Sequence, residues 1–171
     1  RWVPLSAGAY KTITIHLAAL VYEPPTPSEQ PPKRQKEKGD LARYQKAAEA
    51  GDAQSQNNLG DLYYFGRVVK KDYQEALKWY RKAAAQGNRN GLYNTGHMYY
   101  KGYGTTKNYQ EALRYFTKAA EAGQAAAQND LGSLYYYGIG VKKDYQEALK
   151  WYRKAAAQGN KNAIAALDRL K

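Results

Sequence analysis

Cysteine is absent from this sequence and histidine is nearly so, which excludes several kinds of site. Without cysteine there can be no disulfide bond and no thiolate metal ligand. The two histidines, His16 and His97, lie far apart in the sequence and have no partner at metal-ligand spacing, so we expect no zinc site. No apolar run approaches the length of about 20 residues that a membrane-spanning helix needs.

Motifs that carry catalysis or bind cofactors are also missing. The sequence contains no P-loop, no dinucleotide-binding glycine motif, no H-E-x-x-H and no G-x-S-x-G. Gly102 with Gly104, and Gly138 with Gly140, form a G-x-G pattern. A phosphate-binding loop requires a preceding strand, however, and these glycines follow helical patterns. We therefore expect no catalytic residues, no cofactor and no metal, and we do not expect an enzyme.

Positive charge and tyrosine are abundant instead. The formal net charge is +12, which favours an acidic partner such as a protein, a nucleic acid or an anionic lipid. A lysine-rich surface also serves solubility alone, and this alternative stays open. The 18 tyrosines suit both packed helices and binding surfaces, because tyrosine buries its ring while its hydroxyl reaches water.

A 36-residue repeat organises most of the chain. Residues 69–88 and 141–160 have the same sequence, VKKDYQEALKWYRKAAAQGN. Glycines recur at the repeat spacing in three series, and one aromatic position recurs with them: Gly51, Gly87, Gly123 and Gly159; Gly60, Gly96 and Gly132; Gly66, Gly102 and Gly138; Trp79, Tyr115 and Trp151. Such periodicity is typical of stacked helical units.

Each unit is predicted to form two helices. The first runs over about 53–65 and ends at Gly66, as helices commonly end at a glycine. Gly60 lies within it and costs helix propensity. Its recurrence indicates that a partner helix approaches too closely for a side chain. The second helix begins at Asp72, with Glu75 three positions later as in a capping box.

The predicted fold is all-α, a right-handed α-α superhelix (solenoid) of helical hairpins. Three or more stacked units are needed, because each copy buries the apolar face of the next. The full repeats are expected at about 51–86, 87–122 and 123–158, with half-units at 40–50 and 159–171. All six prolines lie in residues 1–39, which we divide into an extended arm, 1–23, and a proline-rich basic linker, 24–39.

The repeated residues carry a specific pattern, which the third unit matches almost throughout: Ala120-Glu121-Ala122-Gly123, Leu131-Gly132, Asp144-Tyr145 and Trp151-Tyr152. This pattern resembles the Sel1-like repeat, a relative of the tetratricopeptide repeat, over about residues 40–171. The first unit departs from it at Arg67-Val68, and the second at Thr95, Thr105 and Tyr115. The resemblance implies an adaptor that assembles protein complexes. It also favours an exported bacterial protein, although the sequence does not fix the compartment.

A surface for a partner is expected on the first helix of each unit. Tyrosine pairs recur there, with asparagine or aspartate ahead of them. We predict a peptide groove lined by Asn58, Tyr64, Asn94, Tyr100, Asp130 and Tyr136. Helix packing is the alternative, since aromatic stripes at helical spacing are commonly core. His97 takes the position of Asp61 and Ser133, so we expect an exposed helix residue there.

The N-terminal arm contains a strand-like alternation, with Ile13, Ile15 and Leu17 on one face. A lone strand has no sheet to join, and its backbone donors need partners. The arm is therefore disordered, a leader remnant, or an assembly strand that pairs with another chain.

Three functions follow from these observations. The first is a non-catalytic scaffold that binds proteins, with an acidic protein and a second copy of this chain among the candidate partners. The second is a structural subunit that self-assembles through the arm and the solenoid ends. The third is a polyanion or nucleic-acid binder driven by charge, with nucleic acid the less favoured partner.

Overall fold

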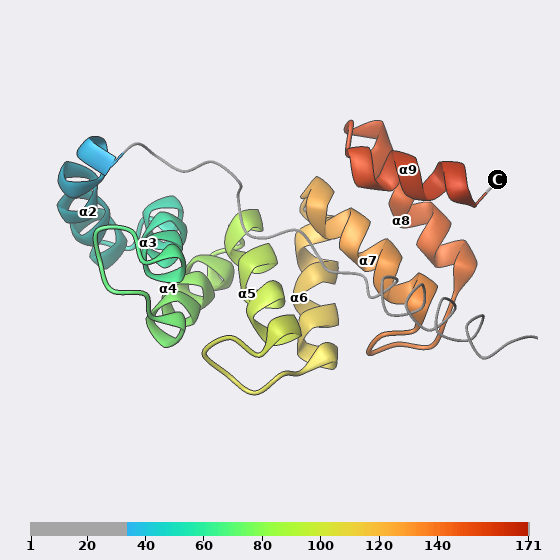
Figure 1. Ribbon diagram of the computed structural model, residues 1–171, viewed down its shortest axis with the longest axis horizontal. Coiled ribbons are helices and arrows are strands. Elements are labelled where there is room, and N and C mark those ends of the chain that lie inside the picture. Colours follow the sequence, from blue (N-terminus) through green and yellow to red (C-terminus); the bar gives the residue numbers. More distant parts are fainter. Residues whose placement is uncertain (1–33, 171) are drawn as a thin grey trace, which may run out of the picture.

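The described chain consists of helices joined by turns and loops. The computed structural model describes the backbone of residues 34–170 and the side chains of residues 41–170. Within this range the helices are α2 (Arg34–Glu49), α3 (Ala53–Phe65), α4 (Tyr73–Ala85), α5 (Arg89–Lys101), α6 (Tyr109–Glu121), α7 (Ala125–Tyr137), α8 (Tyr145–Ala157) and α9 (Lys161–Arg169). Figure 1 shows them arranged in chain order from one end of the molecule to the other.

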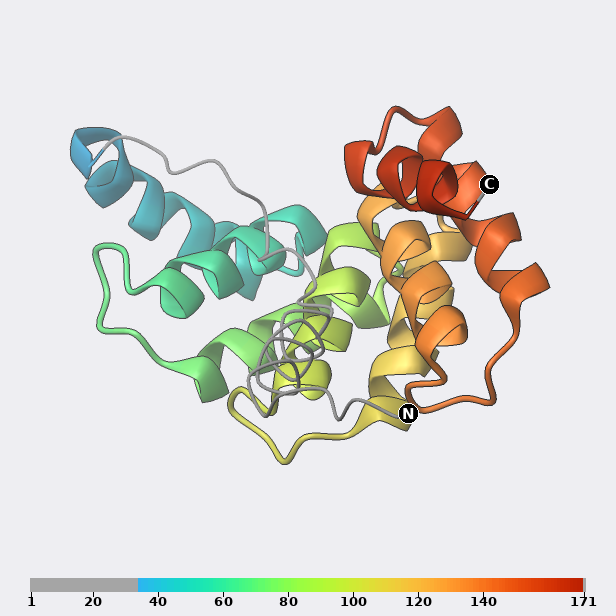
Figure 2. The same ribbon diagram turned by 45° about the vertical axis from the view of Figure 1, so that its right-hand side comes forward.

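The helices pair as hairpins that stack on one another. Helix α3 packs against α4, α5 against α6 and α7 against α8, and each hairpin also packs against the next. We call α3, α5 and α7 the first helices and α4, α6 and α8 the second helices. The half-units α2 and α9 lie at the two ends (Figures 1 and 2). The predicted all-α solenoid of 36-residue hairpins is confirmed.

Backbone caps explain where the helices begin and end. The first helix ends at Gly66, whose left-handed φ of 67° lets its N–H reach the carbonyl oxygen of Leu62. The second helix begins after Asp72, whose side chain accepts hydrogen bonds from the amides of Gln74 and Glu75 at 2.9 and 3.0 Å. The same caps recur in the other two units, so the predicted helix signals are confirmed.

The recurring glycine inside each first helix marks the place where the two helices of a hairpin touch. A Cβ atom on Gly60 would lie 2.5 Å from two ring carbons of Tyr80 on α4. Gly96 faces the ring of Phe116 and Gly132 that of Tyr152 in the same way. The predicted reason for the glycine, a close partner helix, is therefore confirmed.

A second set of glycines lies where each loop touches the preceding unit. A Cβ atom on Gly104 would lie 2.3 Å from the carbonyl oxygen of Tyr73, and one on Gly140 would lie 2.8 Å from that of Tyr109. Both glycines have positive φ, 66° and 69°. The first unit holds Val68 at this position, with φ of 55° and 36% of its surface exposed. Within the described chain, no complete hairpin precedes this loop.

The N-terminal half-unit is longer than the sequence indicated. Helix α2 begins at Arg34 and so takes in residues 34–39, which the sequence predicted as part of the linker. The physical reason is composition: the last proline is Pro32, and most of the residues from Arg34 to Lys38 are good helix formers. The arm and its residues Ile13, Ile15 and Leu17 lie outside the described part of the chain.

Candidate binding site

Polar side chains on the first helices form hydrogen bonds inside the solenoid. Asn94 donates from Nδ2 to Oδ1 of Asn57 at 3.0 Å, and to Oδ1 of Asp61 at 3.4 Å. Tyr80 donates its hydroxyl to the same Asp61 oxygen at 2.7 Å. Buried polar groups are costly unless they are paired in this way. These contacts therefore fix how α5 docks on the first hairpin.

Burial corrects much of the predicted groove. Asp130 is fully buried and accepts a hydrogen bond from the hydroxyl of Tyr93 at 3.0 Å. Burial raises the pKa of Asp130 well above its usual range. Asn94, Tyr64 and Tyr100 are also buried. These side chains contact neighbouring helices of the same chain, so they offer little surface to a partner. The expectation that these four line an open groove does not hold, because the units pack more closely than the periodicity revealed.

Two of the predicted groove residues keep some exposure. Asn58 is half-buried and accepts a hydrogen bond from Gln54 at 2.9 Å. Tyr136 is half-buried and meets the rings of Tyr137 and Tyr145 edge to face, at 4.9 and 5.2 Å between centroids. A partner contact through Asn58 or Tyr136 stays a prediction.

His97 is also not where the sequence placed it. It is fully buried, and neither ring nitrogen has a hydrogen-bond partner among the described residues. In the other units the equivalent residue pairs with a tyrosine hydroxyl: Asp61 with Tyr80 at 2.7 Å, and Ser133 with Tyr152 at 3.0 Å. The middle unit has Phe116 in place of that tyrosine. Burial, with a smaller contribution from Lys101, lowers the pKa of His97 to about 4.

The second helices carry a different surface, in which cations lie over aromatic rings. Lys82 Nζ is 4.1 Å from the ring centroid of Trp79, and Lys154 Nζ is 4.3 Å from that of Trp151. The negative face of an aromatic ring attracts a cation at this distance. We call this row, with its counterpart in the middle unit, the ring face: Trp79, Lys82, Arg114, Tyr115, Trp151 and Lys154.

The middle unit departs from this arrangement. Arg114 lies over Tyr115, with Cζ 4.5 Å from the ring centroid, and also pairs with Glu111 at 2.7 Å. Lys118 occupies the position of Lys82 and Lys154. Its ammonium group makes no hydrogen bond, ion pair or ring contact with the described residues. The α6 helix therefore presents an ammonium group that has no bonded partner among the described residues.

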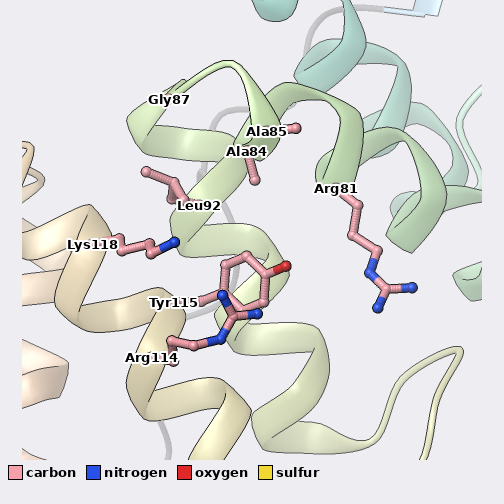
Figure 3. A pocket seen from close by; sticks show the side chains of 8 residues that line it. All are labelled: Arg81, Ala84, Ala85, Gly87, Leu92, Arg114, Tyr115 and Lys118. Carbon is pink, nitrogen blue, oxygen red and sulfur yellow. The ribbon is translucent and has the colours of Figure 1, made fainter.

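A pocket of about 340 Å³ opens beside this lysine, where α4, α5 and α6 meet (Figure 3). We call it the junction pocket; its lining residues are Arg81, Ala84, Ala85, Gly87, Leu92, Arg114, Tyr115 and Lys118. Arg114 and Lys118 line it from α6 and Arg81 from α4, and in Figure 3 the guanidinium of Arg81 lies apart from the other two cations. Arg81 donates a hydrogen bond to the hydroxyl of Tyr99.

The electrostatics of the pocket are positive. A hydrogen bond from Arg114 lowers the pKa of Glu111, and the charges of Arg114, Arg81 and Lys118 lower it further. Recognition of an anionic group is the chemistry that this site can perform.

In the described chain, no three His, Asp or Glu side chains gather as a metal site requires. The described helices also include no candidate for a membrane span, since each is too short or too polar.

The repeat pattern agrees with a known family. The Sel1 repeat model matches residues 44–52, 53–88, 90–124 and 125–160, which together exceed half of the chain. The chain belongs to the Sel1 repeat family. Two of the matched Sel1 repeats begin at the first residue of a first helix, Ala53 and Ala125, which agrees with the hairpins described above.

Solved structures include similar Sel1 repeat proteins. One from Oxalobacter formigenes is 38% identical, with a TM-score of 0.70, and the match covers 76% of this chain and 98% of that one. The c5321 protein of uropathogenic Escherichia coli, a protective antigen with an SLR fold, is 40% identical with a TM-score of 0.70. That match covers 72% of this chain, which spans only 26% of the c5321 chain.

A third structure shares the fold alone. Cysteine-rich protein B of Helicobacter pylori is 24% identical, with a TM-score of 0.62, over 79% of this chain and 97% of that one. No curated protein sequence matches the chain.

Proposed function

We propose that this Sel1 repeat protein is a non-catalytic scaffold that binds an acidic segment of a partner protein on its ring face. The observation that carries the proposal is the row of three rings at the repeat spacing, each with a cation over it, at 4.1, 4.5 and 4.3 Å from the ring centroid. Trp79 and Trp151 are themselves buried, so the cations above the rings are the groups that a partner would meet. A repeated row of this kind suits an extended partner.

The charge of the ring face supports an acidic partner. Lys78 and Lys150 pair with glutamates of their own helices at 2.9 and 2.8 Å, which offsets their charge. Lys82 and Lys154 have only a ring as a partner and keep their full charge toward solvent. Together with the net charge of +12, this arrangement attracts negatively charged partners and speeds their encounter.

The test compares two charge-reversal pairs in the full chain. Lys82→Glu with Lys154→Glu changes the ring face, while Lys142→Glu with Lys143→Glu makes the same charge change in an exposed turn. Each protein serves as bait in an extract of the source organism. We expect a partner that the native chain and the turn variant retain and that the ring-face variant loses. The affinity of that purified partner is then measured against all three baits.

Other outcomes separate the alternatives. Equal loss of binding in both variants, with affinity that falls steeply with salt for any duplex DNA, would point to a non-specific polyanion binder. Retention of every partner by the ring-face variant would refute the ring face as the binding surface. The turn variant has the same net charge as the ring-face variant and is therefore the control for overall charge.

A second candidate, self-assembly, is favoured by the C-terminal end of the solenoid. Inside the chain, Tyr73 stacks on Tyr103 of the next unit with centroids 4.5 Å apart. The equivalent Tyr145 is 56% exposed. Light scattering over a concentration series should show an assembly that Tyr145→Lys reduces. A monomer at all concentrations would exclude this candidate.

A further inference from the structure

We propose that the junction pocket binds a carboxylate group of a partner peptide, with the adjoining side chain placed against Tyr115 and Leu92. The inference rests on the proposed scaffold function and adds the site and the chemical group that the site recognises.

Comparison between units shows that the pocket walls are specific to this junction. Residues 36 apart are equivalent, and the position of Ala85 holds Glu49 in one flanking junction and Glu121 in the other. The position of Arg81 holds Gln45 and Thr117 in those junctions. Relative to both flanking junctions, the pocket junction therefore lacks one acidic residue and has one additional cation. Both changes favour an anion.

The neighbouring junctions also contain a glutamine pair that the pocket junction lacks. Gln86 donates to Gln56 at 2.8 Å, and Gln56 donates to the carbonyl oxygen of Ala48 at 3.0 Å. Gln158 and Gln128 repeat the first contact at 2.7 Å. At the pocket the corresponding positions hold Leu92 and Ala122. Two polar side chains are thus replaced by apolar ones, and one of these, Leu92, lines the pocket together with the three cations.

The three cations are available to a ligand to different degrees. The ammonium group of Lys118 has no hydrogen bond, ion pair or ring contact with the described residues. The Arg81 guanidinium donates a hydrogen bond to the Tyr99 hydroxyl and lies 5.5 Å from the centroid of that ring. Arg114 shares its charge with Glu111. An arginine fork matches the two oxygens of a carboxylate, and the lysine adds a point charge.

The size of the pocket indicates how much of a partner enters it. Its volume of about 340 Å³ is at the low end of the range of about 300–1,000 Å³ for small-ligand sites. A carboxylate and one adjoining side chain suit this space, whereas a folded domain does not.

Part of the pocket lining recurs at the C-terminal end of the described chain. Arg153, Ala157 and Ile164 occupy the positions of Arg81, Ala85 and Leu92. In the described chain no further second helix follows to supply the opposite wall. This end therefore provides a half-built copy of the pocket and a matched place for a control substitution.

Three N-acetylated dipeptides that all begin with Phe test whether the pocket recognises a carboxylate. Acetyl-Phe-Glu-amide carries a side-chain carboxylate, acetyl-Phe-Gln with a free C-terminus carries a main-chain carboxylate, and acetyl-Phe-Gln-amide is neutral. Each is titrated into the ¹⁵N-labelled full chain while amide shifts are followed. We expect the largest shifts at Gly87 and Leu92 for at least one acidic dipeptide, and binding at least about ten-fold weaker for the neutral one. The stronger acidic dipeptide identifies the source of the carboxylate.

A matched pair of variants ties the binding to the pocket. Ala85→Glu restores the acid of the neighbouring junctions inside the pocket, and Ala157→Glu makes the same change at the half-built copy. Both residues are exposed at the end of a second helix, so both variants are expected to fold. We expect Ala85→Glu to weaken acidic dipeptide binding about ten-fold or more and Ala157→Glu to change it less than about two-fold.

Each of the following results would overturn the inference. The neutral dipeptide could bind as tightly as the acidic ones, the two variants could behave alike, or acetyl-Phe-phosphoserine-amide could bind more than about ten-fold tighter than the carboxylates, which would make phosphate the ligand. Capture of a partner that depends on Lys82 and Lys154 but is unchanged in Ala85→Glu would leave the scaffold function standing while removing the pocket. Retention of every partner by both the ring-face variant and Ala85→Glu would remove both.

Discussion

Replacing Gly104 with alanine tests the contact by which one unit docks on the preceding one. Two costs are expected. The backbone at Gly104 has φ of 66°, and an alanine held in this left-handed region loses about 1–2 kcal/mol. In addition, the new Cβ would lie 2.3, 2.6 and 2.9 Å from the carbonyl oxygen and carbon of Tyr73 and the amide nitrogen of Gln74. These are backbone atoms, so no side-chain rotation relieves the overlap.

Relief requires the loop to move away from the start of α4. That movement would separate Tyr103 from Tyr73, whose rings now stack with centroids 4.5 Å apart and planes 5° from parallel. Overpacking of this kind costs about 1–3 kcal/mol. We therefore expect Gly104→Ala to lower the free energy of unfolding by about 2–5 kcal/mol in total.

Gly87 supplies the matched control. Its φ of 77° is also left-handed, but a Cβ there would meet nothing within 4 Å. Gly87→Ala should lose only the backbone cost of about 1–2 kcal/mol. Urea unfolding of both variants, followed by far-ultraviolet circular dichroism, measures the difference. Equal destabilisation by the two substitutions would refute the claim that the Gly104 contact holds consecutive units together.

Three further predictions concern positions where one unit departs from the others. Val68→Gly should stabilise the protein by about 1 kcal/mol in urea unfolding, because a β-branched residue is strained at φ of 55° and the side chain is partly exposed; a loss of stability would show that its apolar contacts dominate. Phe116→Tyr should stabilise the middle unit by about 1 kcal/mol, measured as a rise in Tm, by giving His97 the hydroxyl partner that Asp61 and Ser133 have; an unchanged or lower Tm would contradict the pairing. The pKa of His97, about 4 in the fold, lies below its ordinary value of 6.5, so stability is full above pH 6.5 and falls by up to about 3 kcal/mol as pH drops toward 4. Unfolding at pH 7, 5.5 and 4 in native protein and His97→Ser should show this loss in the native chain alone, and parallel curves would exclude His97 as its source.

The sequence predicted the helices well because their signals are local. Glycine at a left-handed C-terminal position and aspartate at the N-cap depend on the backbone of a few neighbouring residues, and Gly66 and Asp72 occupy those positions in the structure. The close approach at Gly60 was also predictable, since a glycine inside a helix weakens it and recurs only where a side chain would collide with a neighbour. The 36-residue spacing then determined how the hairpins follow one another.

The surface was harder to predict because it depends on which residues meet across helices. His97 was expected to be exposed from its polar equivalents, yet Asp61 and Ser133 are polar because each faces a tyrosine hydroxyl. Asn94 and Asp130 were expected to be free to bind a partner, but they pair with residues of adjacent helices. The junction pocket combines residues from α4, α5 and α6. Its signal in the sequence is Ala85, which stands where the flanking junctions have glutamate, and this difference is visible only when the junctions are aligned.

Val68 also bears on how such a chain can grow by duplication. The identity between the first and third units begins at Val69 and Val141, immediately after the positions held by Val68 and Gly140. Those two positions differ in their surroundings, since Gly140 lies against the backbone of the preceding unit. A copy of the third unit could take the first place in an array. A copy of the first unit placed inside the array, however, would bring the Val68 side chain against the backbone of the preceding unit, where there is no room for a side chain. The order of the units is therefore not interchangeable, despite their near identity.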